Sequence, residues 1–258
     1  MTLTKNQILY IEDVIRACLR DKFLNYKPES SNMPFHYRLL GKDRMVLYSF
    51  IHSLNTAFGT SIFEPAAVAL AKLRFKDAKR SAIAGNQISE EAHKVIQTIM
   101  DGLITGKKEP NKAEEIEAIR EVCNKGKMNI VKPTKVDVLV VSHDESIFLF
   151  DIKTAKPNIG NFKEFKRTLL EWVAAALAQN PDAKINTCIA IPYNPYEPKP
   201  YERWTMKGLL DLDSELKVAD EFWNFLGGEG CYNELLTCFE RVGIELRPEI
   251  DEYFSKFK

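Results

Sequence analysis

The segment KVDVLVVSHDESIFLFDIK, residues 135–153, decides the fold of this chain. Two runs rich in valine, isoleucine and phenylalanine, 136–142 and 146–153, are separated by the polar residues 143–145. A loop of this length is common in β-hairpins, so the segment predicts two antiparallel strands. Both faces of the hairpin carry apolar side chains, which is typical of a sheet covered on both sides. The sequence therefore predicts a buried hairpin with other elements packed on each face.

Charged residues gather at one end of this hairpin. The register set by the loop places Val138 opposite Phe150 and Asp137 opposite Asp151, so that the two carboxylates share one face about 5 Å apart. Like charges at that spacing destabilise a sheet unless a cation compensates them, and Mg²⁺ prefers carboxylate oxygens. Lys153 points to the same side about 7 Å further along the strand. The three charged side chains therefore predict a site for a metal ion, a water molecule and a phosphate group.

An ordinary structural role is the alternative for these three residues. A bare D-x-K pattern is frequent, and charged residues often end strands at the solvent boundary. The shared face of the two aspartates and the apolar character of the hairpin favour the catalytic interpretation.

The pattern D-(x)13-D-x-K on an apolar hairpin resembles the core motif of the PD-(D/E)xK nucleases. Three further stretches, SIFEPAAVALA (61–71), KTAKPNIGNFKEFKRTLLEW (153–172) and IPYNPYEPKPYERW (191–204), are similar to the TdeIII group of type II restriction endonucleases, to which MjaII is related. The resemblance covers residues 49–204. One departure is that the family's proline directly before the first aspartate is Val136 in this chain, with Pro133 nearby.

This resemblance implies an α/β (α+β) fold of the restriction-endonuclease type, with a small mixed sheet, a central hairpin, flanking helices and a helix-rich N-terminal half. It also implies magnesium-dependent hydrolysis of double-stranded DNA, with GGNCC as the target. A homodimer is expected, because a two-fold protein matches a palindromic target. In such an enzyme Asp137, Asp151 and the carbonyl of Ile152 bind Mg²⁺, and Lys153 orients or helps to deprotonate the attacking water.

Glu64 is a further candidate for catalysis and metal binding. In many such nucleases a helix before the hairpin sends a glutamate toward the metal, and the resemblance covers this segment. The alternative is structural, because Ser61 and Glu64 fit a capping box and Pro65 fits the first turn of a helix. The resemblance favours the catalytic role.

Six side chains after the hairpin are candidates for DNA contacts: Lys163, Lys166, Arg167, Asn194, Lys199 and Arg203. The first three begin the helix that follows the site, and phosphate contacts usually flank the scissile bond. The last three lie in a proline- and tyrosine-rich loop and offer groups that read base edges. The alternative for this loop is a rigid connection whose aromatic residues pack on the protein.

Hydrophobic periodicity predicts helices in the first half of the chain and a mixed arrangement after it. The expected helices span residues 6–23, 43–58 (stopped by Gly59), 61–75, 89–103, 111–123 and 161–179, with further helical segments toward the C-terminus. A strand at 185–191 can pair beside the hairpin, with helix 161–179 as a right-handed crossover. Residues 27–40 are expected to form a polar loop. The basic run 72–80 is expected to continue the helix from Ser61, where it grips DNA or forms a solvated face.

Composition sets the outer bounds. The 258 residues are 45% hydrophobic, which is ample for a core, and the net charge of zero decides nothing about a nucleic-acid partner. No segment has the length of a membrane-spanning helix, and acidic residues come too early for a secretory signal. Five scattered cysteines without CxxC spacing indicate reduced thiols in the cytoplasm. The absence of a glycine-rich phosphate loop predicts that no nucleotide cofactor is used.

The domain organisation is expected to be simple, because the chain has no repeat, low-complexity tract or clear linker. We expect one nuclease domain over residues 1–258, with a helical part at about 1–130, a catalytic core at about 131–206 and a helical part at about 207–258. Two other functions stay open. One is a repair or junction-resolving nuclease on the same core, and the other is a non-catalytic module that binds DNA or protein.

Overall fold

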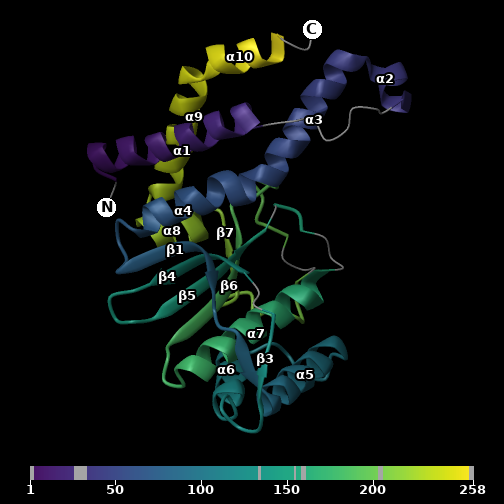
Figure 1. Ribbon diagram of the computed structural model, residues 1–258, viewed down its shortest axis with the longest axis vertical. Coiled ribbons are helices and arrows are strands. Elements are labelled where there is room, and N and C mark those ends of the chain that lie inside the picture. Colours follow the sequence, from purple (N-terminus) through teal and green to yellow (C-terminus); the bar gives the residue numbers. More distant parts are fainter. Residues whose placement is uncertain are drawn as a thin grey trace.

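A five-stranded mixed sheet forms the centre of the computed structural model, which describes residues 3–25, 34–132, 135–153, 155–157, 161–202 and 206–255. The strands lie in the order β1-β4-β5-β6-β7 (Figure 1). Their bounds are Asp77–Ile83 (β1), Lys135–Val141 (β4), Ile147–Ile152 (β5), Ile185–Ile191 (β6) and Leu216–Val218 (β7). β1, β4 and β5 are antiparallel neighbours, whereas β5, β6 and β7 are parallel. The expected mixed sheet with a central hairpin is confirmed.

Strands β4 and β5 form the hairpin in the predicted register. Val138 pairs with Phe150 and Val140 with Phe148. Along β4, Val136, Val138 and Val140 are fully buried, whereas the residues between them are half-buried. This alternation reflects the period of two in a strand, which sends successive side chains to opposite faces.

Helix α7 (Phe162–Gln179) connects β5 to β6, which lies parallel beside β5. Ile152 pairs with Ala190, and the Lys153 N–H donates a hydrogen bond to the Ala190 carbonyl at 2.9 Å. The predicted helix and strand are therefore confirmed. Because β5, β6 and β7 are parallel, their C-terminal ends meet at one edge of the sheet, which is also the edge where β4 begins.

Helices cover both faces of the sheet (Figure 1). α4 and α8 pack on one face, with α1 and α9 behind them, and α7 lies on the other face with α5 and α6. The ring centroids of Phe150 and Phe222 are 5.3 Å apart, and those of Phe148 and Phe225 are 4.9 Å apart, so α8 covers the hairpin directly. The helices are α1 (Lys5–Asn25), α2 (Pro34–Leu40), α3 (Lys42–Ala57), α4 (Glu64–Ala71), α5 (Glu90–Ile104), α6 (Lys112–Arg120), α8 (Asp220–Gly227), α9 (Cys231–Glu245) and α10 (Arg247–Ser255).

Two of the predicted helices begin at side-chain caps. The Ser89 hydroxyl accepts a hydrogen bond from the Ala92 N–H at 3.0 Å at the start of α5. The Asn111 side chain accepts one from the Glu114 N–H at 3.2 Å at the start of α6. These bonds satisfy N–H groups that have no partner inside the helix, which is why the helices begin there.

The prediction that the basic run 72–80 continues a helix is wrong. α4 ends at Ala71, and residues 77–83 form β1, the edge strand paired with β4. Arg80 pairs with Val138 and Ala82 with Val136. Pairing with a strand far along the chain outweighs local helix propensity in this segment, and the charged side chains of the run suit an exposed edge.

Other differences are local. Gly59 does not stop the helix before it, because the π-helix η1 (Phe58–Phe63) connects α3 to α4. Residues 34–40 are helical and not a loop, while residues 26–33 lie outside the described part of the chain. A small sheet of β2 (Gln87–Ser89) and β3 (Met128–Ile130) was not predicted, nor was β7.

All five cysteines are free thiols, and four of them are buried. In the residues that the structure describes, no helix combines the length and the apolar character that crossing a membrane requires.

Candidate active site

Asp137 and Asp151 meet at the edge of the sheet where β4 begins and β5 ends. The paired ladder of the hairpin stops at Val138 and Phe150. Beyond it, Asp137 Oδ2 accepts a hydrogen bond from the Ile152 N–H at 2.8 Å, so that a side chain replaces the ladder. The charge of Asp151 acts on the Asp137 carboxyl group, which shows that the two side chains lie near each other. The structure thus brings the two acids together, with a local break in the ladder that the register did not predict.

Burial makes this edge unfavourable for negative charge. Burial, followed by the charge of Asp151, raises the pKa of Asp137 to about 6. Glu64, the first residue of α4, is only 2% exposed. Burial, followed by the charge of Asp137, raises the pKa of Glu64 to about 7. The three acids therefore form one electrostatically linked group in an environment of low polarity.

The capping box predicted as the alternative for Glu64 does not form. The residue before α4 is Phe63, and no side chain caps this end of the helix. The Glu64 side chain instead lies 3.8 Å from Lys135, measured between Oε2 and Nζ. Its burial beside Asp137 is therefore not explained by helix capping.

Two lysines approach the acids. Lys153 Nζ lies 2.7 Å from Asp151 Oδ1 and 4.5 Å from the centroid of the Phe165 ring. Lys135, two residues before Asp137 on β4, has a side chain that is 49% exposed. Lys135 was not predicted as a site residue, although its spacing from Asp137 places the two residues on the same face of a strand.

The paired aspartates fit a divalent cation. Burial and the charge of Asp151 both oppose ionisation of Asp137, and a cation between the carboxylates would counter both effects. Within the described ranges, no three Asp, Glu, His or Cys side chains gather closely enough to hold one ion. The structure therefore does not bring Glu64 into a cluster with the pair. A two-carboxylate set suits Mg²⁺, which commonly keeps several waters and takes one or two carboxylates.

A cavity of about 870 Å³ adjoins this edge. Its walls are mainly apolar and come from η1, the end of β5, the segment after β6, α8 and α9. Ile152 and Lys153 line it, so it opens beside the acids. Trp223 forms part of the wall and is fixed there by a hydrogen bond from its Nε1–H to the Pro192 carbonyl at 2.7 Å.

The predicted DNA contacts differ in how accessible they are. Lys163 and Lys199 are exposed. Arg167 is half-buried and donates a hydrogen bond to the Gln97 Oε1 at 2.8 Å. Asn194 bonds within its own loop, because its Nδ2 donates to the Lys199 carbonyl and its Oδ1 accepts from the Tyr196 N–H. Arg203 lies outside the described residues.

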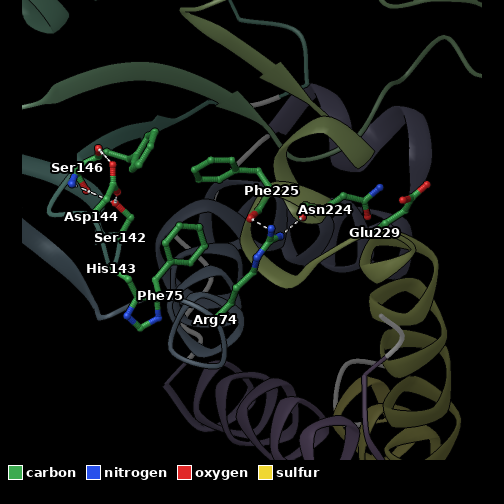
Figure 2. Close-up of a pocket in the computed structure, with 10 residues that line it drawn as sticks. Arg74, Phe75, Ser142, His143, Asp144, Ser146, Asn224, Phe225 and Glu229 are labelled. Carbon is green, nitrogen blue, oxygen red and sulfur yellow. Dashed lines mark hydrogen bonds between the residues drawn. The ribbon is translucent and has the colours of Figure 1, made fainter.

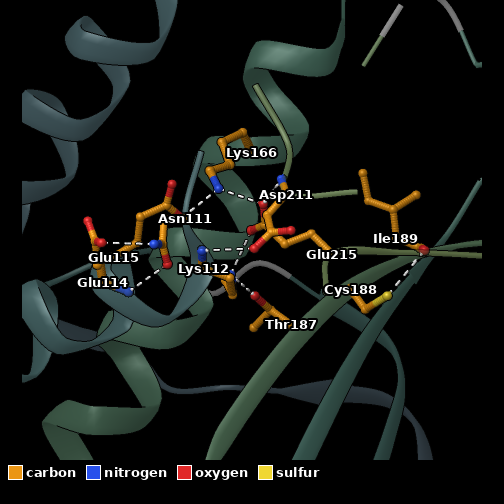
Figure 3. Close-up of polar contacts among 10 residues, drawn as sticks. All are labelled: Asn111, Lys112, Glu114, Glu115, Lys166, Thr187, Cys188, Ile189, Asp211 and Glu215. Carbon is orange, nitrogen blue, oxygen red and sulfur yellow. Dashed lines mark hydrogen bonds and ion pairs between the residues drawn. The ribbon is translucent and has the colours of Figure 1, made fainter. Parts of the chain in front are cut away.

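The prediction that Lys166 contacts DNA is wrong in this structure, because its side chain is fully buried. Figure 3 shows the polar contacts that surround it. Its Nζ donates hydrogen bonds to Glu115 Oε2 at 2.5 Å and to Glu215 Oε2 at 2.6 Å. Lys112 completes this network, with its Nζ 2.8 Å from Glu215 Oε1 and 2.6 Å from Thr187 Oγ1. The network ties α6 and α7 to β6 and to the residue before β7. Lys166 is thus an internal ion-pair partner.

A second hollow, of about 700 Å³, lies at the turn of the hairpin, the end opposite to the acids (Figure 2). Arg74 donates hydrogen bonds there to the carbonyls of Asn224 and Phe225, each at 3.3 Å. The Asp144 carboxylate accepts hydrogen bonds from the Ser142 and Ser146 hydroxyls. Because these polar groups are satisfied within the protein and lie far along the strands from Asp151, the hollow does not form part of the candidate active site.

The mixed sheet, the helices on both faces and the acids at the shared edge define a restriction-endonuclease-like fold. The family model described as "Type II restriction endonuclease, HinfI" matches residues 3–243. The chain belongs to this family of type II restriction endonucleases, which are site-specific DNA endonucleases.

Named relatives agree with this assignment. The type II restriction enzyme MjaII of Methanocaldococcus jannaschii is 28% identical, over 99% of this chain and 74% of that protein. HgiCII of Herpetosiphon aurantiacus is 28% identical, over 84% of this chain and 80% of that protein. HgiEI of the same organism is 26% identical, over 85% of this chain and 80% of that protein. The predicted similarity to type II restriction endonucleases related to MjaII is confirmed, and the family match extends beyond residues 49–204 on both sides.

Proposed function

We propose that this chain cleaves both strands of DNA at a specific sequence in a magnesium-dependent reaction. The observation that carries the proposal is that Asp137 Oδ2 accepts a hydrogen bond from the Ile152 N–H, directly after Asp151, while Lys153 Nζ lies 2.7 Å from Asp151 Oδ1. Membership of a type II restriction endonuclease family supports DNA as the substrate. The same membership supports a restriction enzyme over a repair or junction-resolving nuclease and over a non-catalytic module.

Each residue at the edge has a separate role in this proposal. Asp137, Asp151 and the main-chain carbonyl of Ile152 would hold Mg²⁺, and Glu64 is an outer carboxylate beside Asp137. The metal, when bound, acidifies water and stabilises negative charge on the phosphate. Lys153 orients the attacking water and offsets charge on the phosphate, because its ammonium group lies at the same edge.

DNA binding is proposed to depend on exposed cations near this edge. Lys135 lies beside Glu64 with half of its side chain exposed, and Lys163 and Lys199 are also exposed. An exposed ammonium group can replace counterions on the phosphate backbone. Arg203 stays a candidate in the same loop as Lys199. Arg167 and Asn194 would first have to leave the hydrogen bonds that hold them.

A homodimer is proposed as the active form. The described residues supply one Asp137–Asp151–Lys153 set per chain, and two strands require two such sets. A two-fold dimer matches a palindromic target, and the resemblance to the TdeIII group supports GGNCC as that target. We further propose that residues 1–258 act as one nuclease domain in the cytoplasm, with the catalytic core at about 131–206 between helical parts.

The test of this function is digestion of an unmodified plasmid by the wild type and by Lys153→Ala with magnesium. We expect discrete bands from the wild type and a loss of about 10²- to 10³-fold or more in cleavage rate for the variant. Binding of the variant to DNA in calcium should stay largely intact, because Lys153 acts on the reacting groups. Lys184→Ala is the matched control, since Lys184 is an exposed lysine that pairs with Asp144 at the far end of the hairpin.

Other outcomes would remove the proposal. Full activity of Lys153→Ala would exclude the assigned site. Nicking confined to branched DNA would indicate a junction-resolving enzyme, and the absence of any magnesium-dependent hydrolysis would favour a binding module. Sequencing of the cut ends would test GGNCC directly.

A further inference from the structure

The Lys153 ammonium group has two contacts of different chemical kinds. One is the ion pair with Asp151, at 2.7 Å between Nζ and Oδ1. The other is the Phe165 ring, whose centroid lies 4.5 Å from Nζ, well inside the range of a cation–π interaction. The Lys153 side chain is 27% exposed, so its charge is partly removed from water, which strengthens such a contact.

The position of the Phe165 ring is fixed by its surroundings. Phe165 lies in the first turns of α7 and packs against the fully buried Phe162, with ring centroids 5.9 Å apart at an interplanar angle of 63°. The next residue, Lys166, is held by the buried ion pairs with Glu115 and Glu215 (Figure 3). The start of α7 is therefore anchored on both sides of Phe165, and the ring offers a rigid surface to Lys153.

The two contacts differ in what they do to the lysine. A carboxylate neutralises the ammonium charge, and Asp151 is also proposed to bind the metal, so it is not dedicated to the lysine. An aromatic ring attracts the cation through its quadrupole without neutralising it and competes neither for the metal nor for the phosphate. A lysine that must stay charged and point at a phosphate needs a contact of the second kind.

We propose that Phe165 is a positioning residue for catalysis, which holds the Lys153 ammonium toward the scissile phosphate through its ring face. This inference rests on the proposed function of Lys153. It predicts an effect on the rate of the chemical step and not on DNA affinity, because the ring touches the lysine while the exposed cations make the DNA contacts.

The decisive experiment replaces Phe165 in the full-length protein with phenylalanine bearing one, two or three fluorine atoms on the ring. Fluorine withdraws electron density from the ring face and changes the ring volume little, so it weakens the cation–π contact in steps. We expect single-turnover cleavage to fall at each step, by roughly 2- to 30-fold over the series. Dissociation constants for target DNA in calcium should stay constant over the same series.

The matched control is the same fluorine series at Phe225, whose ring lies 5.3 Å from Lys217 Nζ. This pair is also an aromatic ring beside a lysine, but Phe225 lines the hollow at the turn of the hairpin, the end opposite to the acids, so its fluorination should leave the cleavage rate unchanged. Among natural residues, Phe165→Trp should keep the rate and Phe165→Leu should lower it. Packing alone predicts the reverse preference, because tryptophan is the poorer fit to a phenylalanine site.

Each outcome decides between the two proposals. A cleavage rate that is flat over the Phe165 series, with Lys153→Ala inactive, would overturn the positioning role and leave the proposed function standing. An equal fall in DNA affinity and rate would also overturn it, because the ring would then contact DNA. A wild type without cleavage would remove the proposed function itself.

Discussion

Lysine and acidic side chains meet in two regions of this protein, with opposite consequences. In the network around Lys166, two cations face two anions, and Lys112 and Lys166 each bond to Glu215 (Figure 3). Burial alone would raise the pKa of Glu215, but the two lysines bring it below its ordinary value. At the edge near Asp137, two lysines face three acids, Asp137, Asp151 and Glu64, and burial, followed by the charge of Asp151, raises the pKa of Asp137 to about 6.

The comparison teaches that charge balance, and not residue type, separates a structural cluster from a reactive one. The balanced buried network holds elements together, although burial raises the pKa of Glu115 and leaves its Oε1 without a hydrogen bond. The edge near Asp137 has more acids than close lysines, so protons or an added cation would stabilise it, which is a property that suits a metal-dependent nuclease.

The largest change in stability is expected from Glu215→Gln in the network around Lys166. This change removes the carboxylate that Lys112 and Lys166 share and leaves buried cations without a full partner. Breaking a buried ion pair in this way costs about 3–5 kcal/mol of unfolding free energy. Urea denaturation measures this loss, while the rate of cleavage by the remaining folded protein should change little. Glu117→Gln is the control, because Glu117 pairs with Arg120 on the surface and should change stability by less than about 1 kcal/mol.

Asp137→Asn, in contrast, is expected to raise the stability of the protein at high pH. A group whose folded pKa is raised contributes stability below its unfolded pKa and loses it as the pH rises through its folded value. For Asp137 this window runs from the ordinary value of 3.8 to about 6. In EDTA at pH 8 the variant should therefore melt a few degrees above the wild type, and the difference should vanish below about pH 4. A variant less stable than the wild type at pH 8 would contradict the unbalanced charge.

Lys135→Ala is expected to have a smaller effect, on the affinity for DNA. Lys135 is half-exposed beside Glu64, so its loss should weaken DNA binding several-fold in calcium at low salt. The slope of log affinity against log salt concentration should fall by about one, as for the loss of a single phosphate contact. Fluorescence anisotropy over a series of salt concentrations measures both quantities. An unchanged slope would place Lys135 away from the DNA, and Lys184→Ala should show no change in either quantity.

How much could be predicted from the sequence depends on how local the determining interactions are. The hairpin register followed from loop length and alternation within residues 135–153, so Val138 and Phe150 were paired correctly. β1 could not be predicted in this way, because it is defined by pairing with β4, more than fifty residues later, and most of its residues are not buried. Because this run of charged residues lies on an exposed edge strand, its sequence lacks the alternation of apolar and polar residues that indicates a strand.

The burial of Lys166 could have been predicted from helical periodicity. Lys166 falls on the same helical stripe as Phe162, Leu169 and Val173, which are all buried, so periodicity alone placed it on the inner face of α7. Its partners Glu115 and Glu215 are separated in sequence by a hundred residues, and no local pattern pairs them. Asp137 and Asp151 were easier to predict as neighbours, because both belong to one hairpin.

The central claim is that the Asp137–Asp151 pair is the metal-binding site. Isothermal titration calorimetry with magnesium, in the absence of DNA, tests this claim most directly on the wild type, Asp137→Asn, Asp151→Asn and the surface control Glu117→Gln. We expect magnesium to bind the wild type and Glu117→Gln alike, with binding lost in both aspartate variants. Equal binding by all four proteins, or none by the wild type at millimolar magnesium, would contradict the account.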